Sequence, residues 1–274
     1  MKTNPKLGKI VRVAAPYRRA AKAAARRRIL YVSKTGNAHK PYRTIPAALR
    51  AARSGDIIEI AAGVYADGDM QLPDNITLRG QGQPTVLVGS TIYTKASHIV
   101  PGNNCVLDNL KISAAPGSVF VNLVGTTESA GEPAFTGFLG SNLWFDGFED
   151  CYHIVHKQRC EAVFEDCHFA SRWDNLAIAY GDHLVDARRC TFNSLYGSDQ
   201  NSSGNQRNML LGNGTIRLTD CEVNTTANAA TMWPVAIGVE IFSYSQGPVG
   251  ALERDGATFH TDGNAQSQDV VNRA

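Results

Sequence analysis

The stretch YRTIPAALRAARSGDIIEIAAGVY, from Tyr42 to Tyr65, predicts a short helix followed directly by a strand. Thr44 stands where a helix N-cap is expected, Pro46 falls in the first turn, and Gly55 is placed to end the helix in a left-handed conformation. These signals indicate a helix of about three turns. Its apolar residues recur at helical spacing, so one side must be buried: Ile45, Ala48, Leu49 and Ala52. The β-branched run Ile57–Ile60 then predicts a strand.

Further along the chain, one short pattern recurs around a cysteine. It is AVFEDCHF at 162–169, VDARRCTF at 185–192 and IRLTDCEV at 216–223. In each copy, apolar residues stand five and three places before the cysteine, at the cysteine, and two places after it. Strand alternation holds on both sides of the polar pair before the cysteine, but its phase shifts across that pair. We therefore expect two short strands that meet at a tight bend and both point these residues inward.

The spacing of this pattern predicts a solenoid. Cys105–Ile112 fits the same template, and looser matches lie around Ile76, Leu143 and Ala257–Phe259. The steps between successive copies have a floor of 23 residues and reach 36. A solenoid gives such a floor because each coil has a fixed girth while loops bulge out between strands. The sequence predicts about seven coils.

The segment from the helix to Gly63-Val64-Tyr65 resembles the entry to the right-handed parallel β-helix of the pectin-lyase-like superfamily. Flanking segments also look like that family: Val32–Asn37, Ile76–Gly82 and Thr85–Gly89. The resemblance implies an all-β, single-stranded right-handed parallel β-helix whose open N-terminal end is plugged by the short helix. It implies little about chemistry.

Charge is distributed very unevenly along the 274 residues. Residues 1–28 carry ten basic side chains and no acidic one, which leaves 17 basic against 25 acidic side chains, a net charge of −8, for the rest. This is a cationic arm on an acidic body. We expect three parts: a basic anchoring arm with a helical segment at 1–28, a β-helix domain at 29–260, and a polar tail at 261–274.

Composition narrows the class of protein. Hydrophobic residues make up 43% and charged residues 19%, and no apolar run approaches the length of a membrane span. The positive charges at the N-terminus are not followed by an apolar region, so we expect no secretory signal peptide. An Arg-rich start is also found in organellar transit peptides, but the usual serine enrichment is missing here. Six cysteines in such a chain favour free buried thiols, stacked in part as an internal ladder of Cys167, Cys190 and Cys221.

Ionisable side chains gather on two neighbouring predicted coils. If the chain is an enzyme acting on a uronate polymer, as the resemblance allows, the acid–base residues are Asp166, His168, Asp182, His183 and Arg188. The expected register places Asp166 beside Arg189 and His168 beside Thr191. The sequence holds no run like those of polygalacturonases or pectin methylesterases. We therefore expect solvated coil edges with local ion pairs and assign no catalytic residue.

One ten-residue window, Cys151-x-His153-x-x-His156-x-x-x-Cys160, holds the residue types that bind zinc. On an extended strand, Cys151 and His153 share a face that His156 does not share. Four ligands converge only if the segment loops. We expect neither a metal nor any other cofactor.

The basic arm is the strongest functional signal. A partner with an acidic surface is expected to be contacted by Lys6, Lys9, Ile10, Arg12, Tyr17, Arg18, Arg19, Lys22, Arg26, Arg27 and Arg28. Pectin-lyase-like β-helices without catalytic runs resemble the tail spikes, head fibres and head-decoration proteins of bacteriophages, which often carry a docking arm and form trimers. The sequence therefore predicts a non-catalytic virion structural protein, a homotrimer that binds the major capsid protein or another virion protein.

Other functions remain open. The chain is alternatively a polysaccharide lyase, hydrolase or esterase of this fold, or a tail spike that binds a host surface glycan. Binding of nucleic acid through the arm alone is disfavoured, and no membrane association is expected. A solvated arm without a partner is the plainest alternative.

Overall fold

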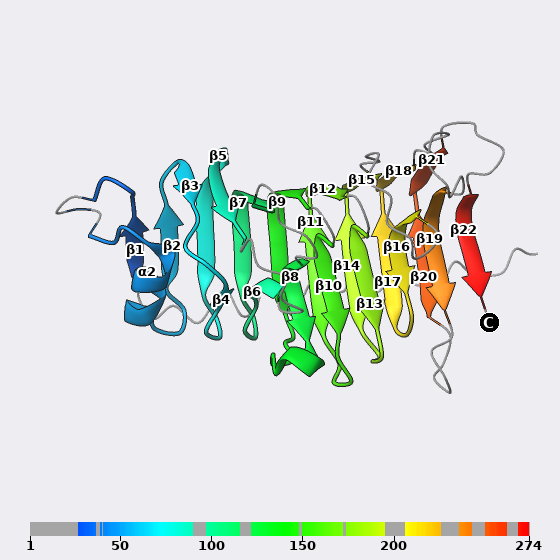
Figure 1. Cartoon of the computed structure of the whole chain (residues 1–274), viewed down its shortest axis with the longest axis horizontal. Helices are drawn as coiled ribbons and strands as arrows, with labels where there is room; N and C mark the ends of the chain where they lie inside the picture. The colour runs from blue at the N-terminus through cyan, green and yellow to red at the C-terminus, as the bar shows by residue number, and fades with distance from the viewer. Residues whose placement is uncertain are drawn as a thin grey trace, which may run out of the picture.

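The computed structural model describes residues 27–36, 39, 41–89, 97–115, 122–147, 150–171, 174–194, 206–225, 236–242, 250–261 and 268–273. Their strands wind into a right-handed parallel β-helix, as the sequence predicts. Figure 1 shows the coils side by side along the long axis, from β1 at one end to β22 at the other.

A fourteen-stranded sheet forms two adjoining rows of the coil wall. The first row is β1 (Ile29–Val32), β2 (Ile57–Ile60), β5 (Thr77–Val88), β7 (Val106–Ser113), β9 (Phe138–Asp146), β11 (Glu161–Glu165), β14 (Leu184–Arg188), β17 (Thr215–Thr219) and β20 (Ala251–Asp255). The second row adds β3 (Gly63–Tyr65), β12 (His168–Ser171), β15 (Thr191–Ser194), β18 (Glu222–Thr225) and β21 (Thr258–Thr261). All of these pairings are parallel.

An eight-stranded sheet closes the third side of the coil. Its strands are β4 (Met70–Gln71), β6 (Ser97–Val100), β8 (Asn122–Thr127), β10 (Tyr152–Val155), β13 (Leu176–Ala179), β16 (Gln206–Leu211), β19 (Ala236–Phe242) and β22 (Gln268–Arg273). A 3₁₀ turn, η1 (Glu128–Ala130), follows β8. Within the described ranges, no helix is long and apolar enough to cross a membrane.

The predicted tight bend joins the two rows of the fourteen-stranded sheet. The residue just before each inward position there has a left-handed φ of 50° to 56°: Asn109, Asn142, Asp166, Arg189 and Asp220. Asn and Asp adopt this conformation more readily than most residues because their short side chains bond locally. The bend turns the chain without losing the inward direction of either strand, so the predicted phase shift is confirmed.

The predicted inner ladders are also confirmed. Phe169 lies opposite Phe192 in the β12–β15 pair, and their rings stack with centroids 4.7 Å apart. Phe145 continues the stack, 4.6 Å from Phe169. Cys190 and Cys221 lie in the neighbouring buried ladder, where the backbone N–H of Cys190 approaches the Cys221 sulfur at 3.5 Å. All six cysteines are free and buried.

The plugging helix is present but shorter than predicted. It is α2 (Ile45–Ala51), with the Thr44 hydroxyl accepting from the Ala47 N–H at 3.3 Å. Gly55 does not end it: the chain is already extended at Ala52, and Gly55 lies in the turn before β2. That turn is held by the Asp56 carboxylate, which accepts from the Arg53 N–H at 2.7 Å. The buried side of α2 packs on the N-terminal end of the core, beside β1 and β2 in Figure 1.

The coil extends beyond the predicted copies at both ends. The matches from Ile76 to Ala257–Phe259 fall on the successive first-row strands from β5 to β20 and on their bends, while β1 and β2 add two more strands before them. At the other end, β22 pairs with β19, so Gln268–Arg273 departs from the predicted polar tail at 261–274. Val270 lies opposite Val239 there and packs against the core. Val270 thus attaches this segment to the core although the composition of the segment is polar.

The cysteine ladder gives a direct test of the core. Cys190→Asp should lower the free energy of unfolding by about 4 kcal/mol or more, because it buries a carboxylate with no counter-charge among apolar neighbours. Cys190→Ala, which removes only the sulfur, should cost about 1 kcal/mol. Urea unfolding followed by circular dichroism measures both. Equal losses in the two variants would place Cys190 outside the core.

Candidate functional site

The five residues proposed for an enzyme are not assembled into one site. Asp166 lies in the bend, where its two carboxylate oxygens accept from Nε and Nη2 of Arg189 at 2.7 and 2.8 Å. This pair was expected from the register, and it is confirmed. The hydrogen bonds from Arg189 lower the pKa of Asp166. Asp166 is therefore a paired carboxylate at an exposed edge, where such pairs contribute little.

His168 and Asp182 lie on different parts of the coil. His168 is on β12 opposite Thr191, as expected, and its Nε2 is 3.2 Å from the side-chain nitrogen of Asn193. Asp182 lies in the turn before β14, three-quarters exposed, and pairs with Arg159 at 2.5 Å. Among the described residues, no hydrogen bond joins His168 to Asp182, and none joins either of them to Asp166.

His183 is a buried structural residue. Its Nδ1 accepts from the Cys160 N–H at 3.1 Å, and its Nε2 donates to the Ala179 carbonyl at 3.0 Å. Both nitrogens are thus used by the backbone, which fixes the neutral tautomer. Gly181 and Gly214 enclose it so closely that a Cβ on either would lie within 2.5 Å of His183 atoms. Burial lowers the pKa of His183.

Arg188 belongs to an ion network on the outer face of the first row. Its Nη2 lies 2.5 Å from Asp186, and its Nη1 lies 3.3 Å from Glu165 on the next strand. Hydrogen bonding to Asp186 raises the pKa of Arg188. The five predicted residues are therefore spread over the bend, the second row, a turn and the first row. Each of these side chains instead contacts its own local partners, and the ion pairs among them match the expected alternative of coil edges with local ion pairs.

The four side chains of the zinc-type window do not converge on one point. Cys151 is buried and its thiol donates to the Ala170 carbonyl at 3.4 Å, while Cys160 makes a 3.6 Å contact with the Gln158 carbonyl. His156 accepts from the Gln158 N–H at 3.0 Å. Within the described residues, no three His, Cys, Asp or Glu side chains are grouped to hold a metal ion.

The predicted partner-binding residues of the arm, apart from Arg27 and Arg28, lie outside the described residues. Arg28 is used by its own body: its guanidinium meets Asp56 at 2.5 and 3.2 Å and donates to the Ala51 carbonyl at 3.2 Å. It ties the start of β1 to the turn between α2 and β2. Arg28 therefore marks the root of the arm.

A histidine–carboxylate group that the sequence analysis did not recognise lies on the eight-stranded sheet. Nδ1 of His153, on β10, is 2.6 Å from Oδ2 of the buried Asp150. The other oxygen of Asp150 accepts from the Asp174 N–H at 3.3 Å. An imidazole held this way by a carboxylate can take up a proton at its second nitrogen. The sequence indicates His153 only as a metal ligand, because it does not show the pairing with Asp150.

Glu132 lies near this pair, after η1. Its carboxylate accepts from the backbone N–H groups of Ser97 at 2.8 Å and Thr127 at 2.7 Å. Burial raises its pKa, against these hydrogen bonds and the nearby His153. A carboxyl group and an imidazole this close together can in principle act as acid and base. The bonds to β6 and β8 also show a structural role, since they fasten the turn to two strands.

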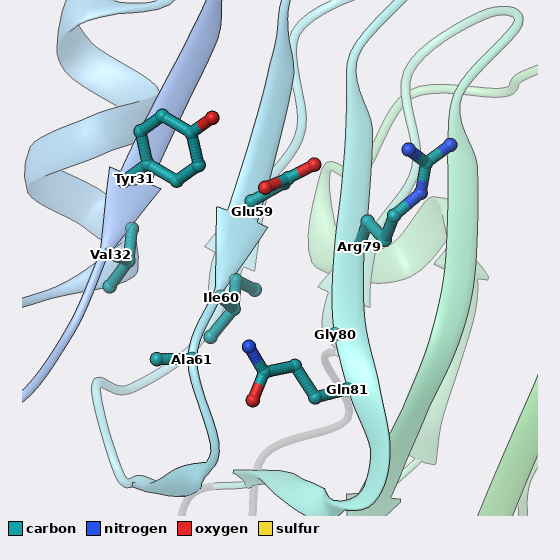
Figure 2. A pocket seen from close by; sticks show the side chains of 8 residues that line it. All are labelled: Tyr31, Val32, Glu59, Ile60, Ala61, Arg79, Gly80 and Gln81. Atoms are coloured by element: carbon teal, nitrogen blue, oxygen red, sulfur yellow. The ribbon is translucent and has the colours of Figure 1, made fainter. Parts of the chain in front are cut away.

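A surface pocket of about 200 Å³ lies at the N-terminal end of the first row. Its polar side chains come from three neighbouring strands: Tyr31 from β1, Glu59 from β2, and Arg79 and Gln81 from β5 (Figure 2). Tyr31 lies opposite Glu59, and Glu59 lies opposite Arg79, so the three form one outward row. The side chain of Gln81 reaches back over Ala61, and its oxygen accepts from the Ala62 N–H at 3.3 Å.

The comparisons with known proteins agree with this architecture. Residues 32–133 match the model of a family described as "Protein of unknown function (DUF1565)". No curated protein sequence matches the chain. Among solved structures, pectin methylesterase PemA from Erwinia chrysanthemi aligns with a TM-score of 0.54 and 14% identity, over 89% of this chain and 92% of that one. The chain has the pectin-lyase-like fold.

Two further solved structures share this fold. Escherichia coli ybhc aligns with a TM-score of 0.64 and 12% identity, over 98% of this chain and 78% of that one. The tailspike protein gp49 of the Acinetobacter baumannii bacteriophage Fri1, a capsular polysaccharide depolymerase, aligns with a TM-score of 0.51 and 14% identity, over 89% of this chain and 48% of that one. At such identities the likeness concerns the fold and not the chemistry.

The buried His183 generates a pH prediction. Because its pKa is lowered in the folded state, the unfolded chain binds the extra proton, and stability falls as pH drops below about 6.5. The free energy of unfolding should therefore be smaller at pH 5.5 than at pH 7.5. His183→Asn should be less stable but less dependent on pH, with a remainder from His168, whose pKa burial also lowers.

His260→Gln, at an exposed position on β21, provides the control and should keep the full pH dependence. Urea titrations at the two pH values measure all three proteins. An unchanged pH dependence in His183→Asn would contradict the structural role of a neutral His183.

Proposed function

We propose that this chain is a non-catalytic structural protein of a bacteriophage virion, docked on the major capsid protein or another virion protein through its basic arm. The observation that carries the proposal is the charge division: ten basic and no acidic side chains in residues 1–28, against a net charge of −8 in the rest. Such an arm lowers its free energy by meeting an acidic surface.

The described part of the body supports this role because many of its basic side chains are paired within it. Salt bridges join Arg79 to Asp108 at 2.9 Å, Arg217 to Glu253 at 2.5 Å and Lys111 to Asp146 at 2.8 Å, in addition to the arginine pairs described above. Each of these pairs links neighbouring strands of the stack. A coil wall with such cross-strand ion pairs is a stiff spacer, and the arm adds a dense group of positive charges for docking.

The strength of docking follows from several small terms. Exposed ion pairs contribute on the order of 0.5 kcal/mol each, so eight basic residues before Arg27 can contribute a few kcal/mol together. Apolar residues such as Ile10 and Tyr17 supply buried anchors that ion pairs cannot supply. In a homotrimer, three linked arms would raise the apparent affinity through effective concentration.

The tailspike likeness is compatible with this proposal. That protein places a body of the same fold on a bacteriophage, and the match spans less than half of its chain. A β-helix body suits such a place because its wall is continuous and its core is a stack of inward ladders. The proposed location of the chain is accordingly the virion.

Replacement of the eight basic residues between Lys2 and Arg26 by glutamine tests the proposal. Arg27 and Arg28 are kept because Arg28 holds the body together through Asp56. The variant should fold with an unchanged melting temperature but lose at least about tenfold in the fraction that cosediments with assembled particles.

The matched control changes only Lys2, Lys6, Lys9 and Lys22 to arginine, which keeps the charge, and it should be incorporated normally. Undiminished incorporation of the glutamine variant would remove the arm from the mechanism. If the intact protein instead bound duplex DNA tightly with a steep salt dependence, the arm would be a nucleic-acid-binding element.

A polysaccharide lyase, hydrolase or esterase is the second candidate function. The observation that favours it is the Asp150–His153 pair with Glu132 nearby, an arrangement with the groups needed for proton transfer. Against it stands the use of Glu132 in fastening η1 to β6 and β8.

Assays on pectin, polygalacturonate and host capsular polysaccharide separate the two functions. Reducing ends and the absorbance of unsaturated uronate report cleavage, and methanol release reports de-esterification. The structural proposal expects no turnover in any assay. Turnover that is lost in His153→Gln and kept in His260→Gln would establish the enzyme and overturn the non-catalytic role.

A further inference from the structure

We propose that the pocket formed by Tyr31, Glu59, Arg79 and Gln81 holds a basic side chain of the protein's own arm, from residues 1–26, in the unassembled subunit. The inference rests on the proposed function only in treating the arm as the docking element. It adds a resting place for that element on the body.

The charge of the pocket selects a cation. Arg79 donates through Nε to Asp108 at 2.9 Å, so its positive charge is already matched from the next strand. Glu59 has no ion-pair or hydrogen-bond partner for its carboxylate among the described residues. The balance of Glu59, Arg79 and Asp108 is one negative charge. A carboxylate or phosphate would be repelled, whereas an ammonium or guanidinium group would be attracted.

The shape of the pocket suits one long side chain. Its volume of about 200 Å³ is below the roughly 300–1,000 Å³ of pockets for drug-sized ligands. Figure 2 shows the Tyr31 ring and the Glu59 carboxylate on adjacent strands on one side, and the Gln81 amide over Ala61 on the other. The aliphatic stem of a lysine or arginine can pack beside Tyr31 and Ala61 while its head meets Glu59. A guanidinium over the Tyr31 ring adds a cation–π contact.

The root of the arm lies within easy reach of the pocket. Arg28 is fixed beside Asp56, just before β1, and the pocket opens near the other end of β1 at Tyr31 and Val32. Four strand residues span about 13 Å. A segment that reverses direction and returns over this distance needs only a handful of residues. Lys22, Arg19 and Arg18 are six to ten residues before Arg28, so each has chain enough.

The same tether favours the protein's own arm over that of another copy. A short flexible linker holds the cation at an effective concentration on the order of millimolar, well above that of subunits in solution. A single ion pair with a cation–π contact is weak, so an intramolecular contact forms where an intermolecular one does not. A larger acidic surface with many contacts would then displace the arm. The pocket thus holds the arm in the free subunit and releases it at assembly.

Limited trypsin digestion of the full-length protein, free of particles, measures the contact, because trypsin cleaves after the arm's own lysines and arginines. In low salt, Glu59→Gln should speed cleavage within residues 1–26 at least about threefold, since the docked fraction is protected. Tyr31→Leu should also speed it, whereas Tyr31→Phe keeps the ring and should stay near the wild-type rate. Salt at 0.5 M should remove the difference between wild type and Glu59→Gln.

Glu222→Gln is the matched control, because Glu222 is an exposed glutamate on the distant strand β18. It should cleave like the wild type. Equal rates for wild type and Glu59→Gln would overturn the proposal. Protection that rises with protein concentration would also overturn it, since the contact would then join two copies.

Particle incorporation keeps this inference separate from the docking function. Glu59→Gln should enter particles at least as well as the wild type, because the arm is released more readily. Loss of incorporation in Glu59→Gln would show that the pocket serves the assembled state instead. If the glutamine-substituted arm were incorporated normally, the docking function would fail while the trypsin result for Glu59 would stand unaffected.

Discussion

The stacking of the coils depends on a left-handed residue in most of the turns between the two rows of the fourteen-stranded sheet. At Asn109, Asp166 and Asp220 this conformation lets the chain turn sharply while the alternate residues on both sides still face inward. A left-handed residue costs up to about 1–2 kcal/mol, less for Asn and Asp. The cost is offset by the ladders that the bend aligns, since stacked aromatic pairs such as Phe169 and Phe192 add about 0.5–1.5 kcal/mol beyond their burial. Stacking in turn requires every coil to have the same girth, which explains the floor in the repeat spacing.

The fold could be predicted because this constraint is local. A bend of two polar residues and the inward residues on either side fall within eight positions, so a single copy around Cys190 already shows the pattern. The ends of the coil lack it. β1 and β2 precede the first bend of the series, and β22 follows the last one, so the repeat pattern does not include them. Helix α2 is shorter than predicted because the Asp56 carboxylate binds the Arg53 N–H and holds the residues before Gly55 in a turn. Asp56 is itself held by Arg28, which is far away in sequence, so the sequence pattern does not show this turn.

The candidate sites show where sequence reasoning stops. The register of Asp166 with Arg189 and of His168 with Thr191 was predicted correctly, yet the proposed catalytic set did not assemble. Neighbouring residues in a coil are divided by the bend and by strand alternation, so closeness in sequence does not make a common face. The pocket is the reverse case. Tyr31, Glu59 and Arg79 are 28 and 20 residues apart and become neighbours only through the pairing of β1, β2 and β5.

A stack of coils presents flat walls, and the side chains on such walls meet their partners on the next coil. In the described part of this chain, several of those partners are of opposite charge, and their pairing along the stack stiffens the wall and uses charges that would otherwise attract a ligand. Glu59 departs from that pattern because its neighbours in register are Tyr31 and an arginine already bound to Asp108. The unmatched carboxylate of Glu59 lies next to β1, the strand that the ten-charge arm leads into, so at this place arm and body carry complementary charges. Under the two proposals, the division of charge between arm and body acts within the free subunit as well as toward a partner. The same arm cannot occupy the pocket and the partner surface at once.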